Sequence, residues 1–461
     1  MTRTRNELLD AILREAGWSR AQAANAYNRI AQENNLHNHT NIGRSHISMW
    51  VGGTKPSGEA PIILCQALSR RLQRLVTPRE LGFTAANAQE HNAPGWQTDP
   101  LTELAELGGT DLDLGRRHLL TNAVYSTAAL TLPGQQWWDT MAAPQPAETR
   151  PRHRIGPADI ETVRDLTAAF SRVDQQRGGG HGRKAVVQYL KTDVAALLQG
   201  SFSTESVQRD MFSAAGELAY LAGWMAFDNS EHALAQRYFV LAVKLAARAD
   251  DPPLTAHILR AMAHQALDLG APKQALDLST ASIDGPRYAN ATPRERALTG
   301  VVHARALATN GHNQAAARTL LQAEDDLTSA DAGTPEPHRT FFFGEASLAH
   351  ETARTLTALG DTPGALRHYQ HSIRTRGTTF RRTHAVTLGY LGAAHLTQAN
   401  LEEACTVWTT ALDTIENGVH SARARQTITD MRNVLSPYRH RKIPLVTDLD
   451  TRAAHYLAHT R

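Results

Sequence analysis

The stretch "LAYLAGWMAFDNSEHALAQRYFVLAVKLA", residues 218–246, decides the fold of this chain. Small residues recur in it at fixed intervals: Gly223 is followed twelve positions later by Ala235, and then by Phe239 and Ala242. Small side chains allow two helices to approach closely, so this spacing marks the line along which a pair of helices touches. The stretch predicts a helical hairpin.

The same frame of small residues recurs four more times towards the C-terminus. Its anchoring alanines lie 40, 41, 49 and 39 positions apart, and they are Ala235, Ala275, Ala316, Ala365 and Ala404. Each anchor follows a small residue on the preceding helix, namely Gly223, Ala263, Ala304, Ala353 and Gly392. This spacing resembles that of tetratricopeptide repeats, whose usual unit is about 34 residues. The resemblance implies an α-solenoid with a concave face, and the alternative is a set of helical hairpins of no particular family.

The first helix of each pair carries a candidate ligand-binding face. Aromatic and charged residues recur there at intervals of three, four and seven, which places them on one side of each helix. The candidates are Tyr220, Trp224, His257, Arg260, His264, Arg305, His350 and Arg354. We expect them at solvent-lined positions of the concave face, where they could bind a peptide or an anionic small molecule. The alternative is that these charges are simply solvated.

The N-terminal segment predicts a separate bundle of short helices. Leu8, Leu9, Ile12 and Leu13 share one helical face, and Ser19 is a good N-cap for a second helix. In the third helix, "IGRSHISMWV" (42–51), the residues predicted to pack inward are Ile42, Ile47 and Trp50. "EAPIILCQALSRRLQR" (59–74) predicts a fourth helix.

The exposed face of the third helix suits the major groove of DNA. It carries Arg44, Ser45, His46 and Ser48, and arginine can contact guanine through two hydrogen bonds. Residues 1–86 hold eleven Lys and Arg against six Asp and Glu. We expect the phosphate contacts to come from Lys55, Arg70, Arg71 and Arg74. The alternative is a helical bundle with ordinary solvated charges.

Three segments resemble known regulators. "SHISMWVGGTKP" (45–56) resembles the recognition helix and following turn of the xenobiotic-response-element (Cro/repressor-like) helix-turn-helix family. "LSRRLQRLVTPRELGF" (68–83) and "AAFSRVDQQRGGGHGRKAVVQYLKTDVAALLQG" (168–200) are similar to actinomycete regulators that join such a domain to tetratricopeptide repeats. The segment before the third helix is longer than in the compact motif. The resemblance implies a cytoplasmic, nucleoid-associated transcriptional regulator of development or secondary metabolism.

Two consequences for function follow from this reading. One helix-turn-helix buries too little surface to bind a genomic site tightly, so a homodimer on double-stranded DNA is expected. The solenoid would sense a peptide or small-molecule effector. The alternative function is a non-enzymatic adaptor, in which the solenoid binds a protein and the N-terminal bundle serves for docking.

The predicted organisation is all-α with four parts. It has a DNA-binding domain at 1–86, a linker at 87–157, a solenoid at 158–435 and a C-terminal tail at 436–461. The linker contains an apolar run, "GRRHLLTNAVYSTAALTLPG" (115–134), which is expected to form a buried helix because it is too short to span a membrane.

No motif points to catalysis, a cofactor or a metal. The two cysteines, Cys65 and Cys405, lie 340 positions apart, and the histidines form no recognised ligand motif. The glycine-rich "RGGGHGRK" (177–184) lacks the spacing of a phosphate-binding loop, so a turn between helices is expected there instead.

Overall fold

The computed structural model describes most of the chain. The described residues are 5–33, 41–56, 60–72, 76, 80–83, 95–112, 125–127, 130–143, 154–330, 333, 335–439, 441 and 443–459. They are almost entirely helical, so the all-α prediction is confirmed. The two short strands, β1 (Arg154–Ile155) and β2 (Ser201–Phe202), pair in parallel with each other.

The N-terminal unit has a hydrophobic core of its own. It consists of α1 (Glu7–Glu15), α2 (Arg20–Glu33), α3 (Arg44–Val51) and α4 (Ala60–Leu72). Ser19 caps α2 as expected, because its Oγ accepts the Gln22 backbone N–H at 3.3 Å. Leu8 does not face inward as predicted: it is 55% exposed, and Leu9 and Leu13 fill the core in its place.

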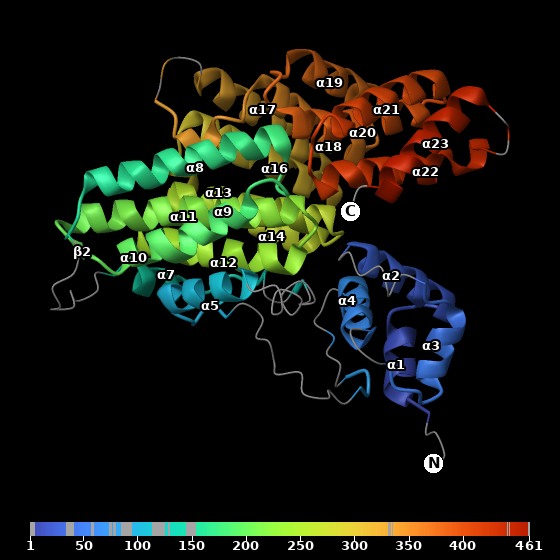
Figure 1. The fold of residues 1–461 in the computed structure, drawn as a ribbon, viewed down its shortest axis with the longest axis horizontal. Helices are drawn as coiled ribbons and strands as arrows, with labels where there is room; N and C mark the ends of the chain where they lie inside the picture. Colours follow the sequence, from blue (N-terminus) through green and yellow to red (C-terminus); the bar gives the residue numbers. More distant parts are fainter. Residues whose placement is uncertain are drawn as a thin grey trace.

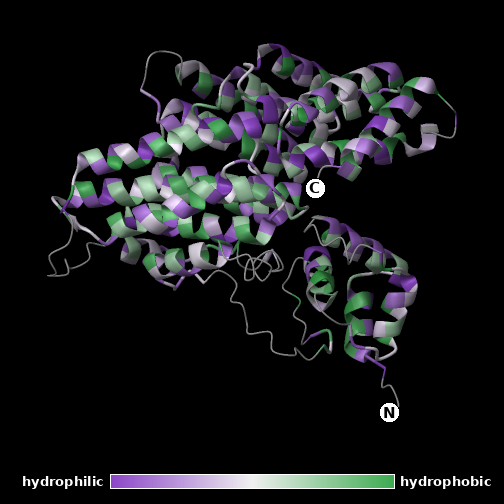
Figure 2. Ribbon diagram, in the orientation of Figure 1, coloured by the Kyte–Doolittle hydropathy of each residue, from purple (hydrophilic) through white to green (hydrophobic). Residues whose placement is uncertain are grey.

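Five helical pairs form the solenoid-like body (Figure 1). They are α11 (Glu205–Asp228) with α12 (His232–Arg248), α13 (Pro252–Asp268) with α14 (Pro272–Ser282), α16 (Pro293–Thr309) with α17 (Asn313–Ala330), α18 (Glu345–Leu359) with α19 (Thr362–Thr375), and α20 (Arg381–Thr397) with α21 (Leu401–Glu416). The first helices of the pairs lie next to one another along the array. Figure 2 shows hydrophobic and hydrophilic residues alternating along these helices, as expected where each helix has one buried face.

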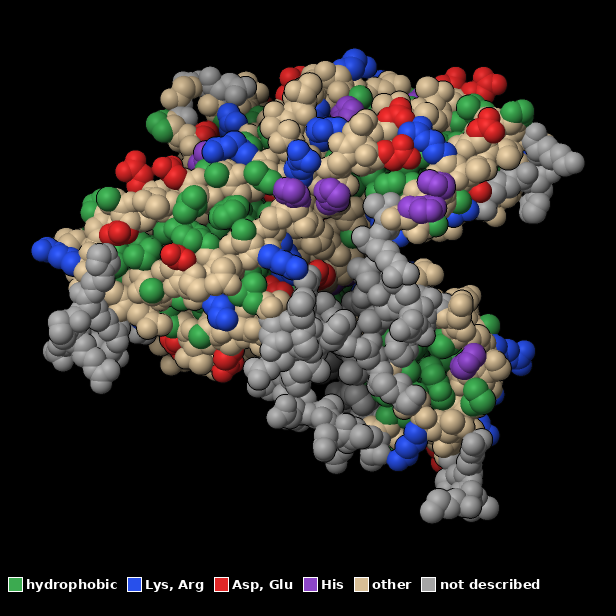
Figure 3. All heavy atoms as spheres, viewed as in Figure 1, with side chains coloured by type: hydrophobic (Ala, Val, Ile, Leu, Met, Phe, Trp, Pro, Cys, Tyr) green, Lys and Arg blue, Asp and Glu red, His purple; other side chains and the backbone are tan. Residues whose placement is uncertain are grey.

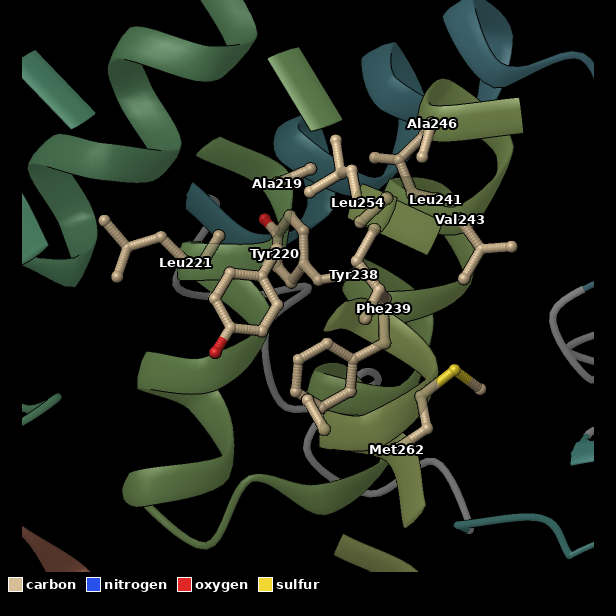
Figure 4. Packing of buried hydrophobic residues seen from close by; sticks show 14 of the residues in the cluster. Ala219, Tyr220, Leu221, Tyr238, Phe239, Leu241, Val243, Ala246, Leu254 and Met262 are labelled. Atoms are coloured by element: carbon tan, nitrogen blue, oxygen red, sulfur yellow. The ribbon is translucent and has the colours of Figure 1, made fainter. Parts of the chain in front are cut away.

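The small-residue frame lies at the helix–helix contacts, as predicted. All five anchoring alanines are at most 1% exposed. A Cβ added to Gly223 would lie 2.8 Å from the Phe239 ring, and one added to Gly392 would lie 2.3 Å from Trp408 Nε1. Figure 4 shows the packing around α11, where Tyr220 lies next to Phe239 and Met262 from the next pair belongs to the same cluster. Each glycine therefore makes room for an aromatic ring of the partner helix.

Helix α8 (Pro157–Arg177) closes the array, because it packs against both α11 and α20. The glycine-rich stretch after it is a turn between helices, as expected, and it leads into α9 (Arg183–Tyr189). A Cβ on Gly179 would lie 2.4 Å from the Met225 carbonyl oxygen, and the Gly180 N–H donates to the His420 carbonyl at 3.0 Å. The glycines thus let the start and the end of the solenoid meet. The remaining elements around the pairs are η3 (Leu190–Val194), α10 (Ala195–Leu198), α15 (Pro286–Ala289) and η4 (His338–Thr340).

The segment predicted as a linker belongs in part to the solenoid core. Both α5 (Pro100–Leu112) and α7 (Gln135–Ala142) pack on α12. Lys244 of α12 is fully buried, and its Nζ donates to the backbone carbonyls of Gly95 and Thr98 and pairs with Glu103 at 2.5 Å. A segment that is held in place by polar contacts needs little hydrophobic periodicity. Its composition therefore indicates a linker although it packs on α12.

The apolar helix predicted at 115–134 is not found in the described part of that segment. Residues 113–124 and 128–129 lie outside the described residues, and 125–127 and 130–134 are not α-helical. Here the backbone N–H and C=O of Ser126 both pair with the Gln236 side chain, at 3.0 and 2.7 Å. A side chain of α12 thus satisfies backbone groups that a helix would have satisfied internally.

The C-terminal tail prediction is wrong. Residues 436–461 contain all of α23 (Pro444–His459), which pairs with α22 (Ala422–Arg439) and adds a sixth hairpin to the array. Val446, Leu449 and Ala453 are buried against the fifth pair and α22. Their spacing of three and four residues is helical, but this pair lacks the small-residue frame from which the other hairpins are predicted.

Candidate functional site

Two regions hold the residues predicted to bind partners, and the first is the outer face of α3. Arg44 and Ser45 are exposed on its first turn, and Lys55 is exposed just beyond its end. His46 and Ser48 are half-buried, because His46 Nδ1 accepts the Gly43 backbone N–H at 3.1 Å and Ser48 Oγ accepts from Arg20 at 3.3 Å. Among the described polar side chains of α3, a guanidinium and a hydroxyl are thus the most exposed.

A reciprocal hydrogen-bond pair sets the position of α3 on α2. Asn28 Nδ2 donates to the Ile42 carbonyl at 2.8 Å, and Asn28 Oδ1 accepts the Ile42 N–H at 3.1 Å. On the buried side, Ile47 is fully enclosed and the Trp50 ring lies 5.7 Å from the Tyr27 ring. Sequence reasoning missed Asn28, although its amide is the contact that fixes where the chain enters α3 after residues 34–40.

Replacing Asn28 with alanine should lower the free energy of unfolding of the N-terminal unit by about 1–3 kcal/mol, because two Ile42 backbone groups would lose their partner. Hydrogen exchange of the backbone amides of α1 to α4 in the full chain would measure the loss. Alanine at exposed Asn25 is the matched control, with an expected change below about 0.5 kcal/mol. Equal stabilities of the two variants would contradict the role of Asn28.

Helix α4 faces the solenoid rather than the outer surface of the N-terminal unit (Figure 1). Arg70 was expected to contact phosphate, but it is 7% exposed and lies close enough to influence the pKa values of Tyr125 and His232. The Arg71 side chain is exposed and its Nε donates to the Ala16 carbonyl at 2.9 Å; Arg74 lies outside the described residues. Lys and Arg side chains also lie at the outer edge of the unit in Figure 3.

The second region is the interior of the solenoid, where the structure brings all eight predicted ligand-binding residues together. Tyr220 and Trp224 line a cavity of about 310 Å³ between α8, α11 and η4. Trp224 also lines a second cavity of about 70 Å³, together with Arg260, His264 and His350. Arg305 and Arg354 pair with acids beside that second cavity, and His257 packs edge-on against Tyr220 with ring centres 4.5 Å apart.

These residues are more buried than expected. Arg260 is 2% exposed and the Arg354 side chain is 19% exposed, whereas both were predicted to be solvent-lined. The reason is the closure by α8 and the loop at His420, which cover the concave side that a simple open solenoid would leave to water. Removing Arg354 will therefore disturb a buried ion-pair network, because this arginine pairs with Asp268.

Arg382 holds the closure together. Its guanidinium lies 3.2 Å from Asp174 of α8 and 3.1 Å from Asp228 at the end of α11, and all three residues are buried. Asp228 also accepts from Ser421 Oγ and from the Gly179 N–H, each at 2.9 Å. Burial raises the pKa of Asp174 to about 6, although Arg382 acts in the opposite direction.

Asp268 and Glu351 form the next layer of the network. Asp268 lies within 3.8 Å of three arginines, which are Arg305, Arg354 and Arg423. Burial, the largest single influence, raises the pKa of Glu351, but Arg305 and the other positive groups around it together outweigh burial and lower that pKa to about 2. Both carboxylates therefore stay ionised in the interior.

The histidines of this region are held neutral. Burial lowers the pKa of His264 to about 4, with Arg305 acting in the same direction. Burial also lowers the pKa values of His257 and His350 well below their ordinary range. The positive charge of the interior thus comes from arginines alone.

Sequence reasoning missed Glu351, which follows the predicted His350, and four further residues of this network, which are Asp174, Arg376, Arg382 and Arg423. Asp174 and Arg423 lie outside the five repeat frames, on helices that close the array. The arginine-rich run "RTRGTTFRR" (374–382), between the fourth and fifth pairs, was the available signal for the other two.

Within the described ranges no group of three or more His, Cys, Asp and Glu residues is placed to hold a metal ion. None of the helices in that part of the chain is both long and apolar enough to cross a lipid bilayer.

A family model described as the SP15 N-terminal domain matches residues 9–84, which is the region of the N-terminal unit. The match covers well under half of the chain. A comparison of the whole chain with curated proteins gives no match.

Proposed function

We propose that this protein is a transcriptional regulator that binds duplex DNA through α3 and responds to an effector bound inside the solenoid. The observation that carries the DNA-binding part is the exposed first turn of α3, where Arg44 and Ser45 stand on a separately packed helical unit with Lys55 at the other end of the helix. Residues at the start of a recognition helix are the ones that reach base edges in the major groove.

The placement of α3 supports this proposal. In Figure 1, α3 lies on the side of the N-terminal unit that faces away from the solenoid, and α4 lies on the near side. DNA could therefore approach α3 without meeting the larger body. Two copies of the chain would present two such helices, as needed to read half-sites about one helical turn apart.

A chain of contacts supports coupling between the effector site and the DNA-binding unit. The Phe227 ring lies 5.8 Å from His264 in the solenoid interior and 5.9 Å from His232 at the start of α12. Arg70 of α4 in turn lies close enough to His232 to lower its pKa. A shift of the α11–α12 turn would thus reach the helix that supports α3.

The full chain should bind duplex DNA with an affinity that falls steeply between 50 and 200 mM salt, because phosphate contacts release counterions. On a site selected from random duplexes, Arg44→Ala should weaken binding by about 1–3 kcal/mol and should weaken binding to random DNA much less. Fluorescence anisotropy with labelled duplexes measures both quantities.

Arg209→Ala is the matched control, because this arginine is exposed on α11 and should leave both affinities unchanged. Equal losses for Arg44→Ala on selected and random DNA would assign Arg44 to the backbone. If the full chain showed no salt-dependent binding at 50 mM salt, the DNA-binding proposal would fail and the adaptor alternative would be favoured.

A further inference from the structure

The interior around the second cavity holds more positive charge than negative charge. The charged groups that line it, with the groups paired to them, are six arginines, Arg260, Arg305, Arg354, Arg376, Arg382 and Arg423, and four carboxylates, Asp174, Asp228, Asp268 and Glu351. Six less four leaves an excess of two positive charges. Arginine does not lose its proton in proteins, so a buried excess of this kind calls for an anion.

The excess can be located on two side chains. Arg260 and Arg376 both line the second cavity, and among the described residues neither has a carboxylate within 4 Å. Arg260 bonds only to neutral groups, the Tyr220 hydroxyl at 3.0 Å and the His257 ring at 3.4 Å, and its Nε is buried without a hydrogen-bond partner. Arg376 bonds to the Ala346 carbonyl and to Ser372 Oγ, and its Nε is likewise buried without a partner.

The larger cavity next to this charge suits an apolar group. The two cavities share Gln175, Trp224 and Phe342 as walls, and the larger one lies at the low end of the volumes of small-molecule sites. Arg339, which also lines the larger cavity, is already paired with Glu217 at 2.8 Å and with Glu295 at 2.6 Å. An anionic group would therefore be attracted to the end at Arg260 and Arg376, and the apolar body would lie against Trp224 and Phe342.

We propose that the two cavities bind one small molecule with an apolar body and a single carboxylate or phosphate group, the anionic group contacting Arg260 and Arg376. This proposal deepens the effector part of the proposed function by giving the chemical class of the effector. It concerns binding to the solenoid in the absence of DNA, so it can fail while DNA binding stands.

Isothermal titration calorimetry of the full chain can test it with octanoate and octyl phosphate as probes. Octanol, which lacks the charge, and inorganic phosphate, which lacks the apolar body, are the two ligand controls. Either anionic probe should bind at least tenfold more tightly than octanol and than inorganic phosphate. Arg260→Gln and Arg376→Gln should each weaken that binding at least tenfold, and Arg209→Gln, on the exposed side of α11, should change it less than twofold.

Both cavity variants are expected to fold, because each substitution removes a buried charge that lacks a counter-charge. Thermal melts of the unliganded proteins check this. Equal binding of octanol and the anionic probes would overturn the role of the arginines. Binding of inorganic phosphate as tight as that of octyl phosphate would overturn the apolar site. No heat of binding with either anionic probe up to millimolar concentration would overturn the whole proposal.

Discussion

Replacing Arg382 with glutamine should lower the free energy of unfolding of the solenoid by about 3–5 kcal/mol. The guanidinium pairs at 3.1–3.2 Å with two carboxylates, Asp174 and Asp228, and the exposed fraction of each of the three residues is 2% or less. Two buried carboxylates would then lack their counter-charge, and such groups cost far more than a surface pair contributes. Helix α8 and the end of α11 would also lose the contact that joins them to α20.

Chemical denaturation of the full chain, followed by far-ultraviolet circular dichroism, would measure this loss. Arg209→Gln is the matched control: Arg209 also pairs with two carboxylates, Glu205 and Asp250, but on the surface, and its removal should cost less than about 1 kcal/mol. Adding Asp174→Asn to Arg382→Gln should recover part of the stability. Equal losses for the two arginine variants would show that the buried cluster does not hold the closure.

The repeat architecture could be predicted because its cause is local. Where two helices cross closely, the side chains must be small, and that requirement leaves Gly223 and Ala235 in the sequence at a fixed separation. Helical spacing likewise predicts which side of the first helix of each pair faces the concave side of the array. All eight predicted ligand residues converge in the structure because i, i+3, i+4 and i+7 positions on adjacent parallel helices must face the same side.

The closure of the solenoid could not be predicted because its cause is not local. Arg382 meets Asp174 across more than two hundred residues of chain, and no periodicity links the two positions. A sequence that gives no sign of this contact predicts an open concave face, on which Arg260 and Arg354 would be exposed to water. The closure converts a row of solvated charges into a buried network with its own electrostatics.

The N-terminal unit likewise has features that helical spacing predicts and features that it does not predict. Its core residues follow from helical spacing, with Leu9 and Ile47 fully buried as predicted. The half-burial of His46 and Ser48 depends on hydrogen bonds to Gly43 and Arg20, which spacing does not specify. Prediction of the face was therefore more reliable than prediction of which side chains on it are free.

The stability of the protein should also fall as the pH is lowered from 7.5 to 5.5. His232, His257, His264 and His350 are fully buried or nearly so, and burial lowers the pKa of each, to about 3 for His232 and about 4 for His264. In the unfolded chain each ring titrates near pH 6.5. The unfolded state therefore binds more protons below that pH, and the stability contributed by the neutral rings is full above about pH 6.5 and is lost as the pH falls.

The expected loss is large because four rings act together. Between pH 7.5 and 5.5 each ring costs about 1.4 kcal/mol, and Asp174, whose pKa is raised to about 6, returns about 1 kcal/mol as it takes up a proton in the folded state. The net loss is about 4.5 kcal/mol, measurable as a shift of the denaturation midpoint across three pH values. His350→Gln should make the dependence shallower by about one proton. A stability that does not change over this range would mean that these histidines are already protonated in the folded interior, and the positive excess around Arg260 would then be larger still.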